Sequence, residues 1–106
     1  MRKAEALIAA DPVLQGIVAL LGRYPNVRQA CLYGSRARGD HRERSDYDLA
    51  FLFSPVAEEG EKARLFLDLQ ENDFTLKKID VAFLDEIKNE SLKETILREG
   101  VELIGR

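Results

Sequence analysis

The sequence predicts an α/β (α+β) fold in which helices pack on one face of a small mixed sheet. Residues 46–53 and 79–84 alternate apolar and polar side chains, as half-buried strands do. The segments that separate the strands carry apolar residues at helical spacing. Because helices and strands alternate along the chain, the helices are expected to cover the apolar face of one sheet.

The first third of the chain is predicted to form two helices and a strand. Residues 3–10 suit a helix, and Asp11-Pro12 is typical of an N-cap followed by proline at the first helical position. The second helix should end before Pro25, because the residue that precedes a proline disfavours helical geometry. Residues 27–33 then form the first strand.

The middle of the chain is predicted to contain a strand and a long helix. A charged loop over residues 40–45 leads to the strand at 46–53, which ends near Pro55 because proline cannot donate to a strand ladder. The helix that follows is expected over residues 58–70. Its inward side chains are predicted to be Leu65, Phe66 and Leu69.

The last third is predicted to form a strand over residues 79–84 and a final helix. Ser91 is the expected N-cap, with Glu94 three residues later, and Gly100 ends the helix. Residues 101–104 are expected either to add a short edge strand or to pack as a tail.

Length and charge limit the possible functions. With 106 residues, the chain is expected to form one domain over residues 1–106. The net charge is −3 and acids and bases are interspersed, so no basic stripe indicates a nucleic-acid partner.

The N-terminal composition and the single cysteine indicate the compartment. The apolar stretch after Arg2-Lys3 is interrupted by Glu5 and Asp11, too early for a signal peptide or a membrane span. Cys31 lies in an apolar run and is expected to be a buried thiol, which suits a reducing compartment. We therefore expect a cytoplasmic protein.

Asp46 and Asp48 are the first candidate site residues. Side chains two positions apart on a strand share a face, so both carboxylates should point the same way. Two like charges this close repel unless a cation lies between them, and oxygen ligands suit Mg²⁺, which also binds substrate phosphates. The pair therefore predicts a metal site.

Gly34 and Ser35 provide the complementary half of such a site. Glycine allows a phosphate to approach the backbone, Ser35 offers a hydroxyl, and free N–H groups at the start of a helix favour an anion. The composition of the next residues predicts a short helical turn. One half of the motif would thus hold phosphate and the other half metal.

Asp80 is the third candidate carboxylate. An Asp-x-Asp pair alone is common, because surface strands often carry acids on their solvent face. Asp80 lies on a second alternating strand, however, and completes a triad if that strand lies beside the one that carries Asp46 and Asp48. Together with Gly34-Ser35, it makes a functional site the favoured interpretation.

These motifs resemble those of the minimal nucleotidyltransferases (MNT) of the polymerase-beta-like superfamily. That family has an apolar residue with Gly-Ser, a spacer of about ten residues, Asp-x-Asp and a later single Asp on a strand. Here the corresponding segments are Tyr33-Gly34-Ser35, Asp46-Tyr47-Asp48 and Asp80, and the similarity extends to residues 92–104. Tyr47 departs from the usual aliphatic residue, but it should face away from the metal and alter only packing.

The resemblance implies a nucleotidyltransferase fold and an activity. We expect transfer of AMP from ATP to a hydroxyl acceptor, with Asp46, Asp48 and Asp80 as metal-binding residues for two Mg²⁺ ions, and with Asp80 also helping to activate the acceptor. Gly34 and Ser35 would bind the triphosphate. The resemblance further implies an antitoxin of the MntA type, which forms a hetero-oligomer with a helical HEPN toxin and adds AMP to a tyrosine of that toxin.

Two alternatives remain open for the function. One is a binding module that neutralises its partner by contact alone, although the intact motif residues argue against it. The other is a transferase acting on a small molecule, which is less favoured because a chain of this length leaves no room for an acceptor-binding domain.

The charged loop offers two nucleotide-binding candidates and one residue that we set aside. Arg36 and Arg38 follow Ser35 closely, and arginine suits phosphate oxygens; alternatively, both are solvated surface charges. His41 is the only histidine, and we expect it to be solvated, because a general base must lie within hydrogen-bond reach of the proton that it removes.

Overall fold

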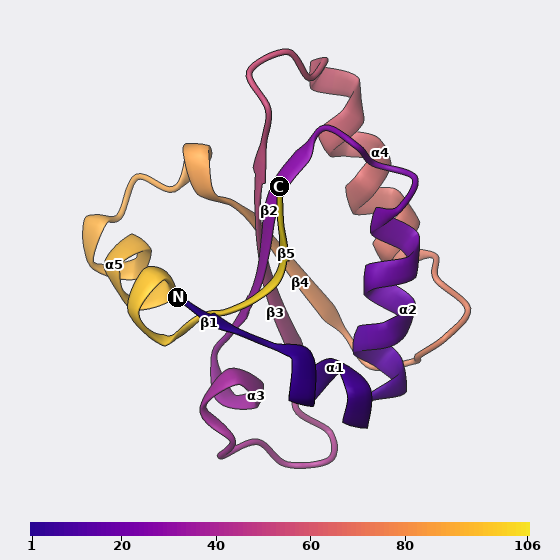
Figure 1. The fold of residues 1–106 in the computed structure, drawn as a ribbon, viewed down its shortest axis with the longest axis vertical. Helices are drawn as coiled ribbons and strands as arrows, with labels where there is room; N and C mark the ends of the chain where they lie inside the picture. Colours follow the sequence, from indigo (N-terminus) through magenta and orange to yellow (C-terminus); the bar gives the residue numbers. More distant parts are fainter.

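A computed structural model describes residues 1–106 as one five-stranded mixed sheet with helices on both faces (Figure 1). In chain order the elements are β1 (Arg2–Lys3), α1 (Glu5–Ala10), α2 (Pro12–Leu21), β2 (Val27–Tyr33), α3 (Ser35–Arg38), β3 (Tyr47–Phe53), α4 (Glu59–Gln70), β4 (Ile79–Phe83), a 3₁₀ turn (Leu84–Glu86), α5 (Glu90–Glu99) and β5 (Val101–Gly105). The predicted mixed α+β class is confirmed.

The strands lie in the order β1-β5-β2-β3-β4. The central strand β2 runs antiparallel to both of its neighbours, β3 and β5. The two outer strands, β4 and β1, run parallel to β3 and β5 respectively. As a result β2 ends, and β3 and β4 begin, at the same end of the sheet.

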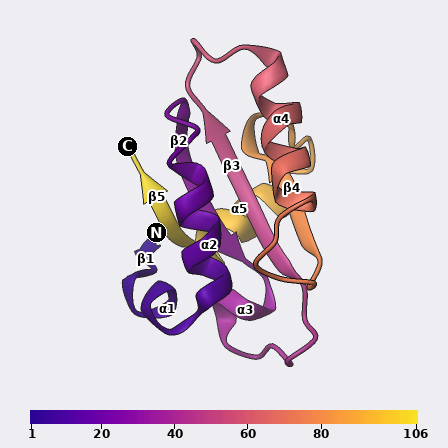
Figure 2. The ribbon, with the colours of Figure 1, turned by 90° about the vertical axis from the view of Figure 1, so that its right-hand side faces the viewer.

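The helices divide between two layers. Helices α1, α2 and α4 cover one face and enclose the larger hydrophobic core, whereas α5 lies on the opposite face, as Figure 2 shows. The prediction that all helices pack on one face is therefore wrong for α5. The physical reason is that Cys31 of β2 and Ala50 of β3 form an apolar patch on that second face, which the fully buried Ile96 of α5 covers.

Several predicted boundaries are confirmed. The Asp11 carboxylate accepts a hydrogen bond from the Val13 amide at 2.8 Å, so it caps α2 as expected. Strand β2 covers the predicted residues 27–33, and the helix predicted over residues 58–70 forms one residue shorter at its start.

Other local predictions are wrong. Phe66 is 42% exposed, whereas Leu65 and Leu69 are buried as predicted. The N-cap of α5 is Asn89, whose side chain accepts from the Leu92 amide at 3.1 Å, so the helix begins before Ser91.

The two ends of the described chain lie side by side in the sheet. Residues 2–3 pair with Val101 and Glu102 rather than beginning a helix. Strand β5 therefore lies inside the sheet between β1 and β2, and it is neither an edge strand nor a tail. None of the helices is long and apolar enough to cross a membrane.

Two polar residues connect the layers. The Tyr47 hydroxyl donates to Asp11 Oδ2 at 2.7 Å, which joins β3 to the start of α2. At the other end of α2, the Arg106 guanidinium donates to the carbonyl oxygens of Tyr24 and Val27 at 2.8 and 2.9 Å. These contacts hold α2 against the sheet at both ends.

Replacing Tyr47 by Phe should lower the free energy of unfolding by about 1 kcal/mol. The substitution keeps the buried ring but removes the hydroxyl that donates a hydrogen bond to Asp11. Urea denaturation would measure this change. Tyr33→Phe is the control, since the Tyr33 ring is half-buried and no hydrogen bond is among the causes of the pKa shift of its hydroxyl. Equal losses in the two variants would contradict a stabilising role for the Asp11 contact.

Candidate active site

Strand register brings the predicted site residues together at one end of the sheet. Asp48 of β3 pairs with Tyr33 at the end of β2 on one side and with Asp80 of β4 on the other. Residues that face each other across a ladder point to the same side of the sheet. The Asp48 and Asp80 carboxylates therefore share the face that α5 covers farther along the strands, and Gly34 follows directly after Tyr33.

Electrostatic repulsion is concentrated on Asp48. Burial raises the pKa of this half-buried carboxyl, and the negative charges of Asp80 and Asp46 raise it further, while Arg38 partly offsets them. The pKa of the Tyr33 hydroxyl is also raised, first by burial and then by Asp48 and Asp80. Asp48 is thus the carboxyl whose charged form is disfavoured, first by burial and then by the charges of Asp80 and Asp46.

Gly34 allows β2 to end against Asp48. Its φ is +75°, in the region that favours glycine, and a Cβ added there would collide with the Asp48 carboxylate. The single-turn helix α3 begins at Ser35, and the amide of Arg38 donates to the Gly34 carbonyl at 3.0 Å. The predicted turn is therefore present beside the carboxylates, with Ser35 half-buried at its start.

The structure corrects the prediction for Arg36. Its guanidinium is buried, donates to the carbonyl oxygens of Ser45 and Glu43 at 3.1 and 3.0 Å, and lies 4.1 Å from the centroid of the Tyr47 ring. Tyr47 points away from the carboxylates, as predicted, because it belongs to the core beneath α2. The Arg36 guanidinium therefore fixes the loop that leads to β3 and is not directed toward a phosphate site.

Arg38 lies on the carboxylate side of the molecule. It forms ion pairs with Asp40 at 3.1 Å and with Glu99 at 3.2 Å, and its charge lowers the pKa of Asp48. The hydrogen bonds to Asp40 and Glu99 raise the pKa of Arg38 itself. This exposed guanidinium is oriented by its two partners and is near enough to the site to influence it.

Sequence reasoning missed Lys78. Its ammonium lies 3.2 Å from Asp80 Oδ1, and its pKa is raised by that hydrogen bond first and then by the charges of Asp80, Asp46 and Asp48. The signal was available, because Lys78 stands two residues before Asp80 and so shares its strand face.

His41 and the small residues beside the aspartates do not join the site. His41 is exposed in the loop after α3, as expected. It borders a small cavity with Asp11 and Arg36, on the side of the sheet that α2 covers. Ala50 is fully buried and Ala82 half-buried, and both pack in the core under α5, so they serve as strand packing.

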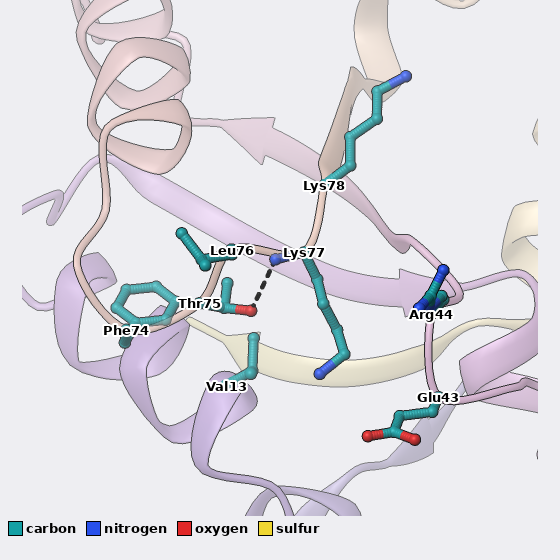
Figure 3. A pocket seen from close by; sticks show the side chains of 8 residues that line it. All are labelled: Val13, Glu43, Arg44, Phe74, Thr75, Leu76, Lys77 and Lys78. Carbon is teal, nitrogen blue, oxygen red and sulfur yellow. Dashed lines mark hydrogen bonds between the residues drawn. The ribbon is translucent and has the colours of Figure 1, made fainter.

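The largest pocket does not contain the aspartates. It has a volume of about 700 Å³ and lies between α2, the loop before β3 and the loop before β4, lined by Val13, Glu43, Arg44, Phe74, Thr75, Leu76, Lys77 and Lys78. Figure 3 shows the side chain of Lys77 extending into this space and that of Lys78 extending away from it. The two lysines thus mark opposite sides of the sheet end.

The donor set fits a divalent cation that is shared with a substrate. No group of three or more His, Cys, Asp or Glu side chains already surrounds one metal position. Mg²⁺ seldom needs such a cage, since it keeps several waters and uses one or two carboxylates together with substrate phosphates. A cation beside Asp48 would also remove the repulsion that raises the pKa of this group.

Fold and site together define a nucleotidyltransferase domain. Asp48 and Asp80 lie on adjacent strands at one end of a mixed sheet, with Asp46 directly before β3 and Gly34-Ser35 directly after β2. The chain belongs to the polymerase beta nucleotidyltransferase family, whose model matches residues 15–106. This confirms the resemblance predicted from the motifs. No curated protein matches the chain.

Solved structures agree with this assignment. One described as a minimal nucleotidyltransferase is 30% identical, with a TM-score of 0.64, and the alignment covers 93% of this chain and 94% of that chain. A toxin–antitoxin structure with AMP-PNP is similar in fold, with a TM-score of 0.69, 22% identity and coverage of 88% and 73%. A complex of a tri-AMPylated HEPN toxin with an MNT antitoxin from Shewanella oneidensis has a TM-score of 0.58, 17% identity and the same coverage.

Gly34→Ala should destabilise the protein more than Gly39→Ala. Both glycines have positive φ, but Gly39 lies in the left-handed region, which costs a non-glycine residue about 1–2 kcal/mol. Gly34, with ψ −156°, lies in a region that is essentially restricted to glycine. A Cβ at Gly39 meets nothing within 4 Å, whereas one at Gly34 collides with Asp48. Urea denaturation of both variants measures the difference, to which the backbone conformation of Gly34 and the collision with Asp48 both contribute. Equal losses would contradict both contributions.

Asp48→Asn should be at least as stable as the wild type at pH 7 in EDTA. The pKa of Asp48 is raised in the folded state, so ionisation of this carboxyl opposes folding. The cost to stability grows as the pH rises from the unfolded-state pKa of about 3.9 through the higher folded-state pKa. The advantage of the variant should therefore vanish toward about pH 3.5. Urea denaturation across a pH series would measure it, and a variant equally destabilised at every pH would contradict a raised pKa of Asp48 in the folded protein.

Proposed function

We propose that this protein is a Mg²⁺-dependent nucleotidyltransferase that transfers AMP from ATP to a hydroxyl of a partner protein, and that it thereby acts as an antitoxin. The observation that carries the proposal is the placement of Asp48 and Asp80 as register partners, with Asp46 and Gly34-Ser35 at the same sheet end. Three carboxylates beside a glycine-led turn suit a reaction between a metal-bound triphosphate and a hydroxyl.

The transfer exchanges a phosphoanhydride bond of ATP for a phosphoester bond to the acceptor. The acceptor oxygen bonds to the α-phosphorus of ATP, the bond between the α-phosphorus and the bridging oxygen breaks, and pyrophosphate leaves. Asp80, the carboxylate farthest from Ser35 across the strands, receives the proton of the acceptor hydroxyl. Two Mg²⁺ ions, when bound, would stabilise the attacking and leaving oxygens.

The remaining residues bind and orient the nucleotide. Asp46 and Asp48 hold the cations, and Gly34 and Ser35 accommodate the triphosphate where the strand turns into α3. Arg38 adds a guanidinium whose direction is set by Asp40 and Glu99. These fixed groups supply orientation, from which much of the rate of a transfer reaction arises.

A protein acceptor is supported by the openness of the site and by the structural relatives. The Asp80 side chain is 37% exposed, and Asp46 and Asp48 are only partly buried. A docked protein would cover this side and hold its own hydroxyl in place. Relatives of the same fold include an MNT antitoxin solved with an AMPylated HEPN toxin, so a helical HEPN-type partner is the proposed acceptor, with a tyrosine as the modified residue.

Incubation of the protein with Mg²⁺, labelled ATP and its HEPN-type partner should increase the mass of the partner by one or more AMP units. The double variant Asp46→Asn, Asp48→Asn should reduce this transfer by at least about a thousandfold, because it removes two cation ligands and the side chains stay nearly the same size. Intact-mass spectrometry of the partner is the measurement.

The controls separate catalysis from contact. His41→Gln should leave transfer unchanged, because His41 lies on the other side of the sheet end. Neutralisation of the partner by the double variant, without a mass change, would show a contact-only antitoxin and overturn the enzymatic proposal. Transfer to a small molecule and not to the partner would overturn the choice of acceptor.

A further inference from the structure

Lys78 is positioned against the carboxylates by the backbone. It directly precedes β4, and its carbonyl oxygen accepts a hydrogen bond from the Tyr47 amide at 3.0 Å, which fixes it beside the start of β3. Its side chain lies on the same strand face as that of Asp80, and the ammonium is 3.2 Å from Asp80 Oδ1. Among the three site aspartates, only Asp80 forms an ion pair.

This ion pair can be exchanged for another. The Lys78 side chain is 67% exposed, and ion pairs at such exposure contribute little to stability. A lysine ammonium is a compact charge on a flexible chain, so it can move several ångströms while its backbone stays in place. The backbone of Lys78 is therefore fixed beside the site, while its ammonium can leave Asp80 and pair with another negative group.

A divalent cation and the Lys78 ammonium compete for the same carboxylate. Both are attracted to Asp80, and their like charges repel each other. A cation that reaches the aspartates would weaken the contact between Lys78 and Asp80. The displaced ammonium would stay beside the site, where a bound triphosphate is the nearest new source of negative charge.

We propose that Lys78 is a nucleotide-binding residue, which pairs with Asp80 in the ligand-free protein and binds a phosphate oxygen of the metal-bound nucleoside triphosphate in the loaded protein. This inference rests on the proposed function, because it takes a metal-bound triphosphate to be the ligand of the aspartate site. It gives a role to a cation that stands outside the Gly-Ser and Asp-x-Asp motifs.

The proposal requires two effects of opposite sign. In the absence of nucleotide, the Lys78 charge opposes a divalent cation, so removing it should strengthen binding of the cation alone. In the presence of nucleotide, the same charge contacts phosphate, so removing it should weaken binding. A lysine that only stabilises the fold would not produce this reversal.

The experiment compares Lys78→Ala with Lys77→Ala as a matched control. Lys77 is the adjacent residue with the same charge, and its side chain extends into the pocket on the opposite side of the sheet end (Figure 3). Isothermal titration calorimetry would measure the binding of Mn²⁺ alone and, separately, of a non-hydrolysable ATP analogue with Mg²⁺. Lys78→Arg, which retains the charge, tests whether charge alone suffices.

Lys78→Ala should bind Mn²⁺ alone about three- to tenfold more tightly than the wild type, and the Mg²⁺ complex of the analogue about tenfold or more weakly. Lys77→Ala should match the wild type in both titrations. Lys78→Arg should match it for Mn²⁺ and be intermediate for the analogue, since arginine keeps the charge but places it differently.

Two results would overturn the inference. One is a Lys78→Ala variant that binds Mn²⁺ alone no more tightly than Lys77→Ala, and the other is unchanged binding of the analogue. A wild-type protein that fails to bind the Mg²⁺ complex of the analogue would instead refute the proposed function. Equal thermal unfolding of both alanine variants and the wild type confirms that binding, not folding, is compared.

Discussion

Repulsion among carboxylates at one end of a sheet is the constraint on which the site depends. Asp48 and Asp80 are register partners, so β3 and β4 cannot pair in this register without bringing them together. The register is fixed by the opposite face, where Leu49 and Phe51 are fully buried, because a shift of one residue would expose them. Core packing therefore holds Asp48 and Asp80 close together, and a cation bound between them would offset their repulsion.

The alternation of side chains made much of this site predictable. Period-two patterns assign Asp46, Asp48 and Asp80 to one face of their strands, and Tyr47 to the other, without knowledge of the sheet order. The N-cap at Asp11 was equally local, since a short acid before proline is sufficient to start a helix. Features that depend on neighbouring residues in the sequence could therefore be predicted from the sequence alone.

Features that depend on contacts between residues far apart in the chain could not be predicted from the sequence. Residues 101–104 are too few to distinguish an edge strand from an inner one, and their place is decided by pairing with β2, some seventy residues earlier. Arg36 had an apparent signal toward phosphate, but the carbonyl oxygens of the loop and the Tyr47 ring surround its guanidinium once the chain folds. The partner of Lys78 could have been found, because it depends only on spacing along one strand.

The place of β5 has a consequence for protein synthesis. β1 pairs only with β5, so residues 2–3 have no strand partner until Val101 and Glu102 have left the ribosome. The strands that carry the aspartates pair with β2 and with each other, and can assemble earlier. The nascent chain can therefore bring Asp48 and Asp80 together before the sheet is complete. Strand β5, which is translated after the other four strands of this sheet, then joins β1 to the rest of the domain.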